Sequence, residues 1–209
     1  HLVVVTRTNG GQVDEEGITL FLVDSDSKGL EKSNFPTVDG LRASEINFDN
    51  VEVNSERMIG DLDKGFNILR TVTNNAILAL CAEAVGAMEV LYKDTVEYTQ
   101  QREQFDHPLS DFQVLQHRMV DMFMETEFSK SYLLKVLATD DAAERTKLVY
   151  GLKHQIAKAG KYVGEEAVQL HGGMGVTEEM SVGHYLKRLL VITNLFGSSD
   201  YFLDKYIDS

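Results

Sequence analysis

The spacing of apolar residues changes near residue 60, and this change constrains the fold more than any other feature of the sequence. Downstream, apolar residues recur every three or four positions, which is the repeat of one helix face. The clearest such run predicts a long helix over residues 64–100 and consists of Ile77, Leu80, Ala84, Met88 and Leu91. Similar spacing predicts helices near 112–136 and 152–163, and one or two helical pieces in 178–208 with a break near Gly197. Long helices with short polar connections favour an antiparallel bundle.

Upstream of residue 60, short runs of β-branched and aromatic residues predict strands instead. Two such runs, 2–6 and 18–23, flank a polar, glycine-containing stretch, and a third lies within 41–53. The alternation in the third run slips by one residue at Asp49-Asn50, which predicts a bulge or a turn. A few short strands seldom form a stable sheet alone, so we expect an incomplete sheet. The chain is therefore expected to be mainly α, with a partial β-sheet domain over residues 1–60 and an antiparallel α-helical bundle over 61–209.

Several local signals mark the expected helix ends. Ser110 to Gln113 fits a capping box, and Asp141 to Glu144 is a looser match. Gly172-Gly173 can stop the helix that precedes them. Within the third helix, glycine lets a neighbouring helix approach closely, and it occurs there as Gly151, Gly160 and Gly164.

Charge and cysteine content argue against several classes of function. The net charge is −13 at pH 7, and an acidic surface repels nucleic acid and anionic membranes. No apolar run approaches the roughly 20 residues of a membrane-spanning helix. The single cysteine, Cys81, excludes an internal disulfide framework and indicates a buried thiol in a reducing compartment, so we expect a cytoplasmic protein. The six histidines lack metal-ligand spacing, and no metal site is expected.

Three short motifs lie in the helical half, and each of them taken alone can be explained as a helix-end signal. Arg102 follows the first long helix, where a cation complements the helix dipole, and Gln113 belongs to the expected capping box. In order and spacing, the motifs together resemble the acyl-CoA dehydrogenase family: Arg102-x-x-Phe105, Pro108-Leu109-x-x-Phe112-Gln113 and Gln169-x-x-Gly172-Gly173-x-Gly175. Three further segments resemble that family's middle sheet domain and the entry to its helical domain: Gly17–Val23, Ile59-Gly60 and Lys64-Gly65-Phe66. The resemblance covers essentially the whole chain.

The resemblance implies a fold and a cofactor. The fold would be the C-terminal part of the family's β middle domain followed by its C-terminal helical bundle, and the cofactor would be FAD. The residues implied to contact FAD from a neighbouring subunit are Arg102, Gln104, Phe105, Gln113, Gln169, Gly172 and Gly173. The arginine would pair with the pyrophosphate, and the glycines would let the backbone approach the dinucleotide. Asp106 departs from the family, which usually has glycine there, and its carboxylate disfavours a nearby pyrophosphate. Because the family's flavin-ring contacts lie mostly before His1, we expect weak or absent flavin in these residues alone.

The base that the family uses is missing from both of its usual positions. In the family, a glutamate removes the α-proton of the acyl thioester while the β-hydride passes to the flavin. The resemblance puts Gly197 at the usual glutamate position and Ala76 at the alternative one, so no catalytic residue is expected here. Asp200 could substitute, although an acidic residue that opens a helix is more often a cap.

The stretches Val168–Thr177 and Phe196–Asp200 are similar to the small subunit of pimeloyl-CoA dehydrogenase and to other glutamate-free subunits of heteromeric acyl-CoA dehydrogenases. This similarity implies a subunit of a FAD-dependent acyl-CoA dehydrogenase that relies on a glutamate-bearing partner subunit. It also implies an acyl-CoA substrate and an electron-accepting flavoprotein. Two alternatives stay open. One is a non-enzymatic binding or scaffold protein that reuses the fold, and the other is a nucleic-acid-binding relative, which the net charge of −13 disfavours.

Overall fold

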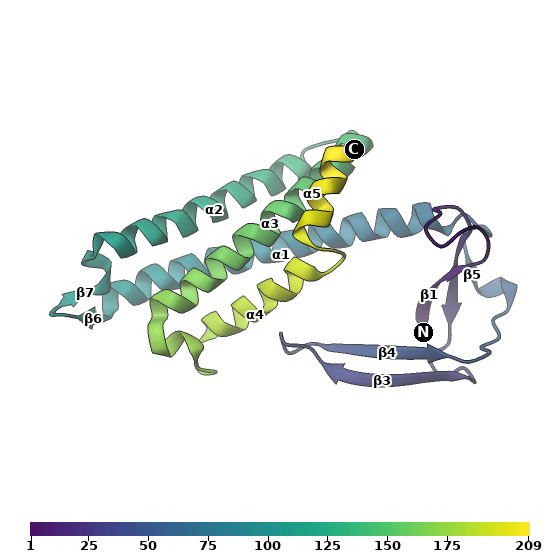
Figure 1. The fold of residues 1–209 in the computed structure, drawn as a ribbon, viewed down its shortest axis with the longest axis horizontal. Helices are drawn as coiled ribbons and strands as arrows, with labels where there is room; N and C mark the ends of the chain where they lie inside the picture. The colour runs from purple at the N-terminus through teal and green to yellow at the C-terminus, as the bar shows by residue number, and fades with distance from the viewer. The chain divides into compact units, whose positions relative to one another are not determined.

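The computed structural model describes all residues from 1 to 209, and they form two compact units, His1–Asn75 and Ala76–Ser209 (Figure 1). The boundary falls within the longest helix, α1 (Gly65–Gln101). The chain is mostly helical with small antiparallel sheets, so the predicted mainly α class with a partial β part is confirmed.

The first unit contains two separate antiparallel β-structures. One is a three-stranded sheet with the order β1-β2-β5, made of β1 (Leu2–Arg7), β2 (Ile18–Val23) and β5 (Met58–Ile59). The other is a hairpin of β3 (Leu30–Pro36) and β4 (Arg42–Phe48), followed by the single-turn 3-10 helix η1 (Ser55–Arg57). Asn50 follows β4 with a φ of 50°, so the slip predicted at Asp49-Asn50 is a turn.

β1 and β2 coincide with the predicted strands, and β4 covers only the first part of the predicted stretch 41–53, because no strand follows the turn at Asn50 until β5. β3 is a strand that the sequence pattern does not indicate. Apart from half-buried Leu30, its residues are exposed, so no buried face creates an apolar alternation. Pairing with β4, from Leu30 opposite Phe48 to Pro36 opposite Arg42, holds β3 in place instead.

The second unit is a bundle with α3 (Ala142–His171) at its centre. This helix packs against α2 (Gln113–Leu137), α4 (Ser181–Asn194) and α5 (Ser199–Asp208), and Figure 1 shows α2 and α3 side by side. Apolar side chains of α1 join the same core. The fully buried core side chains include Met88, Leu91, Met122, Val136, Leu152, Ile156, Leu189 and Ile192. Each such side chain stabilises the fold by about 1.5–3 kcal/mol relative to its exposed form.

Glycines of α3 admit neighbouring helices, as the sequence predicts. A β-carbon at Gly164 would lie 2.7 Å from Cδ1 of Leu186 on α4. At Gly151 it would lie only 2.0 Å from the hydroxyl oxygen of Tyr132 on α2. A larger residue at either position would force the facing side chain of α2 or α4 to move.

The helix ends bear out two of the three predicted signals. Asp141 caps α3, because its carboxylate accepts a hydrogen bond from the backbone N–H of Glu144 at 2.7 Å. Gly172 ends α3 with a φ of 59°. The capping box predicted at Ser110–Gln113 is wrong. Ser110 lies in the 3-10 helix η2 (Leu109–Asp111), and the N-cap of α2 is Phe112, which makes no side-chain cap.

By length and composition alone, α1 is able to span a membrane, contrary to the expectation that no apolar run is long enough. Of its most apolar 18-residue window, 44% is buried within the protein. The core helix of a bundle passes the same test, so α1 is weak evidence for a membrane span.

Candidate cofactor-binding site

A tight hairpin follows α1 and displays the first predicted contact residues. It joins β6 (Glu103–Gln104) to β7 (His107–Pro108) through Phe105 and Asp106, whose φ values are 57° and 63°. Positive φ at both central residues gives a type I′ turn. Aspartate tolerates this backbone, which explains how it stands where the family has glycine, but phenylalanine does so rarely. A strained aromatic turn residue of this kind is typical of functional sites.

The hairpin leaves its polar and aromatic groups available to a ligand. Phe105 is 84% exposed, and its ring only touches the edge of Phe112, with ring centroids 6.2 Å apart. The backbone of Arg102 is fixed, since its N–H donates to the carbonyl of Tyr98 at 2.9 Å. The exposed guanidinium of Arg102 makes no hydrogen bond or ion pair within the chain. Gln113, at the start of α2, is also exposed.

The turn after α3 displays the other predicted residues. The 3-10 helix η3 (Gly172–Val176) follows α3, and Gln169 is exposed one turn before it. Gly172 and Gly173 are exposed, and a β-carbon at either would meet no atom within 4 Å. The space beside these two glycines is therefore open to a ligand rather than filled by the protein. Gly175 differs, because a β-carbon there would lie 2.4 Å from the carbonyl oxygen of Val168.

A contact between α1 and the end of α3 brings these two segments to one end of the second unit. The rings of Tyr98 and His171 stack with centroids 4.2 Å apart, and the Tyr98 hydroxyl donates to the carbonyl of His171 at 3.3 Å. Tyr98 lies one turn before Arg102, and His171 adjoins Gly172. All seven residues predicted to contact FAD thus lie at this end, in the segment 102–105, at the start of α2, in the last turn of α3 and in η3. Figure 1 shows β6, β7 and the start of α2 there.

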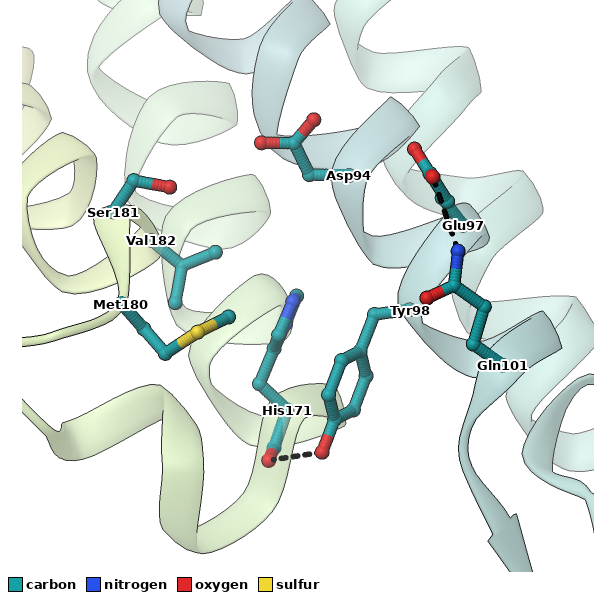
Figure 2. A pocket seen from close by; sticks show the side chains of 8 residues that line it. All are labelled: Asp94, Glu97, Tyr98, Gln101, His171, Met180, Ser181 and Val182. Carbon is teal, nitrogen blue, oxygen red and sulfur yellow. Dashed lines mark hydrogen bonds between the residues drawn. The ribbon is translucent and has the colours of Figure 1, made fainter.

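A pocket of about 200 Å³ lies beside the Tyr98–His171 contact (Figure 2). Its lining comes from the C-terminal part of α1, from His171 and from the start of α4. Asp94 and Tyr98 are four residues apart and so share one helix face. This pocket was not predicted from the sequence. Two features could have indicated it: Asp94 and Tyr98 share one helix face, and His171 lies next to the predicted cofactor contact Gly172. The chain contains no group of three or more histidine, cysteine, aspartate or glutamate side chains placed to hold a metal ion.

The turn between α4 and α5, which holds Gly197, has no room for a side chain. The φ of Gly197 is 137°, and a β-carbon there would lie 2.7 Å from Cδ1 of Tyr201. Ser198 caps α5 by accepting from the N–H of Tyr201 at 3.2 Å, so the cap is not Asp200. Asp200 is an exposed residue of the first turn, where its charge complements the helix dipole.

Two side chains of α3 hold this turn at both ends. Lys153 is fully buried, and its Nζ donates to the carbonyls of Ile192 at 2.7 Å and Thr193 at 2.9 Å, which are unpaired acceptors at the end of α4. Burial lowers the pKa of the Lys153 ammonium. On the other side, Nδ1 of His154 lies 3.0 Å from the carbonyl oxygen of Ser199. Neither contact was predicted, because nothing in the sequence pairs α3 with a turn some 40 residues away.

Comparison with known proteins gives one family. Residues 63–206 match the model of the acyl-CoA dehydrogenase C-terminal domain. The short-chain specific acyl-CoA dehydrogenase of Megasphaera elsdenii is 28% identical over 197 residues, which cover 86% of this chain and 51% of the relative. The mitochondrial isovaleryl-CoA dehydrogenase of Solanum tuberosum is 30% identical over 190 residues, covering 89% of this chain and 46% of the relative.

Solved structures agree with the sequence comparison. Butyryl-CoA dehydrogenase from Megasphaera elsdenii matches with a TM-score of 0.89 and 26% identity, covering 99% of this chain and 55% of that one. The steroid ACAD variant Tcur3481-Tcur3483 matches with a TM-score of 0.80 and 29% identity, covering 92% and 51%. This chain thus spans about half the length of the relatives that it matches.

Proposed function

The chain belongs to the acyl-CoA dehydrogenase family, and from this premise we propose that it is a subunit of a FAD-dependent enzyme that introduces an α,β double bond into an acyl-CoA thioester. We further infer that it lacks a base of its own and relies on a glutamate of a partner subunit. Since the chain spans about half the length of its relatives, the proposal concerns what these residues contribute to the enzyme.

The Arg102 end of the second unit fits a flavin dinucleotide. An unpaired guanidinium suits pyrophosphate oxygens, and two exposed glycines without neighbours allow a phosphate or ribose to approach the backbone. The exposed ring of Phe105 would gain a partner. The charge of Asp106, next to that ring, lowers the expected affinity. FAD, when bound, supplies the acceptor for the hydride of the acyl β-carbon.

The geometry of Gly197 is the observation that carries the missing-base hypothesis. A glutamate at this position would need a φ of 137° and would collide with the Tyr201 ring. The other position, Ala76, has no ionisable group. The carboxylate of Asp200 is three residues away, in the first turn of α5, where its charge complements the helix dipole. Proton abstraction would therefore come from another chain.

An exposed apolar face on α2 supports association with another subunit. The residues of this face are 46–58% exposed and follow helical spacing: Val120, Phe123, Met124, Phe128 and Leu134. Covering such a face removes apolar area from water, at about 25 cal/mol per Å². We propose a homologous glutamate-bearing subunit of the pimeloyl-CoA dehydrogenase type as the partner.

The remaining assignments follow from the family and from the composition. A moderately long, dicarboxylic or steroid side-chain thioester is the proposed substrate, and an electron-accepting flavoprotein is the proposed oxidant. The buried thiol of the single cysteine supports a reducing, cytoplasmic setting. No nucleic acid or membrane partner is proposed.

Reduction of the flavin tests the proposal directly. The complete subunit would be reconstituted with FAD, alone and with a glutamate-bearing partner, and mixed with acyl-CoA without oxygen. We expect the visible flavin band to bleach only when the partner is present. Bleaching by this subunit alone would reveal an overlooked base, and Asp200→Asn would be the first variant to examine. A partner variant with glutamine in place of its base is the control and should not bleach.

The loss of both base positions also favours a second candidate, a non-enzymatic scaffold that reuses the fold. The same experiment separates the two. A scaffold would retain neither FAD nor a glutamate-bearing partner during purification.

A further inference from the structure

The pocket in Figure 2 contains hydrogen-bond acceptors that no group of the chain satisfies. The carboxylate of Asp94, the hydroxyl of Ser181 and the imidazole of His171 are directed toward one space. Asp94 is half-buried, and its side chain takes part in no hydrogen bond or ion pair within the chain. Glu97, by contrast, accepts a hydrogen bond from Gln101 at 3.1 Å. Neither carboxylate has a cationic partner within the chain, and of the two only that of Asp94 accepts no hydrogen bond.

The hydrogen bond of His171 fixes its tautomer. Nδ1 lies 2.8 Å from the carbonyl oxygen of Ala167, and a carbonyl can only accept, so Nδ1 carries a proton. In the neutral ring, Nε2 is then an acceptor. His171 is 3% exposed and stacked on Tyr98, so the ring has little freedom to turn. No group of the chain donates a hydrogen bond to Nε2.

These features define the chemistry of a ligand. A carboxylate and an imidazole acceptor need N–H donors, and the carboxylate charge favours a cation. A guanidinium offers five donors in a plane and stacks on aromatic rings such as the Tyr98–His171 pair. The apolar side chains of Met180 and Val182 line the same pocket and suit a methylene stem. A volume of about 200 Å³ suits a single side chain.

We propose that this pocket binds the guanidinium of an arginine side chain presented by another polypeptide. Asp94 forms the ion pair, Nε2 of His171 accepts a second N–H, and the stem lies against Val182. The negative charge of the whole chain, −13, attracts such a basic segment. The proposal uses none of the residues assigned to the flavin and stands independently of it.

Titration with N-acetyl-arginine N-methylamide tests the proposal on the full 209-residue chain. The readout is the imidazole ¹⁵N shift of His171, which also reports its tautomer. We expect saturable binding with a change at Nε2, and at least about tenfold weaker binding in Asp94→Asn, since a charge-assisted hydrogen bond is lost. Asp94 has no intramolecular partner to lose, so this variant should melt at the same temperature as wild type.

Matched controls separate the pocket from general attraction to an acidic surface. Asp204→Asn makes the same charge change on an exposed residue of α5 and should leave the affinity unchanged. The citrulline analogue, which has the same shape but no charge, should not bind. His171→Phe keeps a ring to stack on Tyr98 and should weaken binding by removing the acceptor; because this variant has no imidazole at position 171, its affinity is measured by the heat of binding. The proposal is overturned by any one of three results: no saturable shift, equal losses in Asp94→Asn and Asp204→Asn, or equal binding of the citrulline analogue.

Discussion

A β-carbon on Gly197 would lie 2.7 Å from Cδ1 of Tyr201, which makes the turn between α4 and α5 specific for glycine. The backbone imposes the same requirement, because a φ of 137° is accessible to few other residues. Lys153 and His154 of α3 hold the two ends of this turn, so relaxation there would break one buried and one partly buried hydrogen bond. The position is therefore closed to a glutamate by conformation as well as by sequence.

Restoring the carboxylate should destabilise the protein without restoring an independent base. We expect Gly197→Glu to lower the free energy of unfolding by about 1–3 kcal/mol, through backbone strain and the clash with Tyr201. Urea denaturation measures this change. Gly40→Ala separates the two causes, because Gly40 has a φ of 83° but open space around it. Its cost should be strain alone, about 1–2 kcal/mol. Wild-type stability in Gly197→Glu would refute the steric argument.

Close packing between α2 and α3 should appear as coupling between Gly151 and Tyr132. Gly151→Ala brings a methyl group to within 2.0 Å of the Tyr132 hydroxyl oxygen, and we expect it to cost about 1–3 kcal/mol of stability. In a Tyr132→Phe background the cost should fall by at least about 0.5 kcal/mol, because the clashing oxygen is gone. Gly86→Ala is the control. It lies within α1 with nothing inside 4 Å, and should stabilise the helix by about 0.5–1 kcal/mol. Additive effects of Gly151→Ala and Tyr132→Phe would contradict the predicted contact.

Stability should fall at alkaline pH because of Cys81. Burial raises the pKa of its thiol from 9.0 to about 12, so above pH 9 the unfolded chain loses a proton that the folded chain keeps. Deprotonation then favours unfolding, by up to about 1.4 kcal/mol per pH unit between pH 9 and 12. Cys81→Ala should reduce this slope, whatever its stability at neutral pH. Burial raises the pKa of Tyr132 from 10.0 to about 12, so Tyr132 contributes mainly above pH 10. Lys153, whose pKa burial lowers, is present in both proteins, so the difference between their slopes from pH 9 to 10 reports Cys81. Equal slopes in wild type and variant over that interval would contradict the assignment.

The sequence predicts those elements whose apolar residues face one core, and it misses contacts that depend on the tertiary arrangement. The periodic run from Ile77 to Leu91 locates α1 to within a residue or two of its ends. β3 was not predicted because its extended conformation depends on pairing with β4 and not on a buried apolar face. From the sequence, Lys153 would be taken as an exposed cation, whereas in the structure the end of α4 buries it.

The candidate site likewise contains residues that the sequence predicts and residues that it does not. Arg102 and Gly172 were named from motif spacing, whereas Asp94, Tyr98 and His171 meet only because α1 and α3 converge. Family motifs are local in sequence and can be read directly. A pocket built from three helices has no such local pattern.

Arg102 should matter for flavin retention and not for folding. Its exposed guanidinium makes no contact within the chain, so Arg102→Gln should leave the melting temperature unchanged. In the assembled enzyme, loss of a charge-assisted contact to the pyrophosphate should weaken FAD binding at least about tenfold. Flavin released on dilution and measured by fluorescence gives the ratio of dissociation constants. Lys158→Gln removes the same charge from an exposed position on α3 and serves as the control. If both variants lose flavin equally, the effect is one of overall charge, and the Arg102 hairpin is not part of the dinucleotide site.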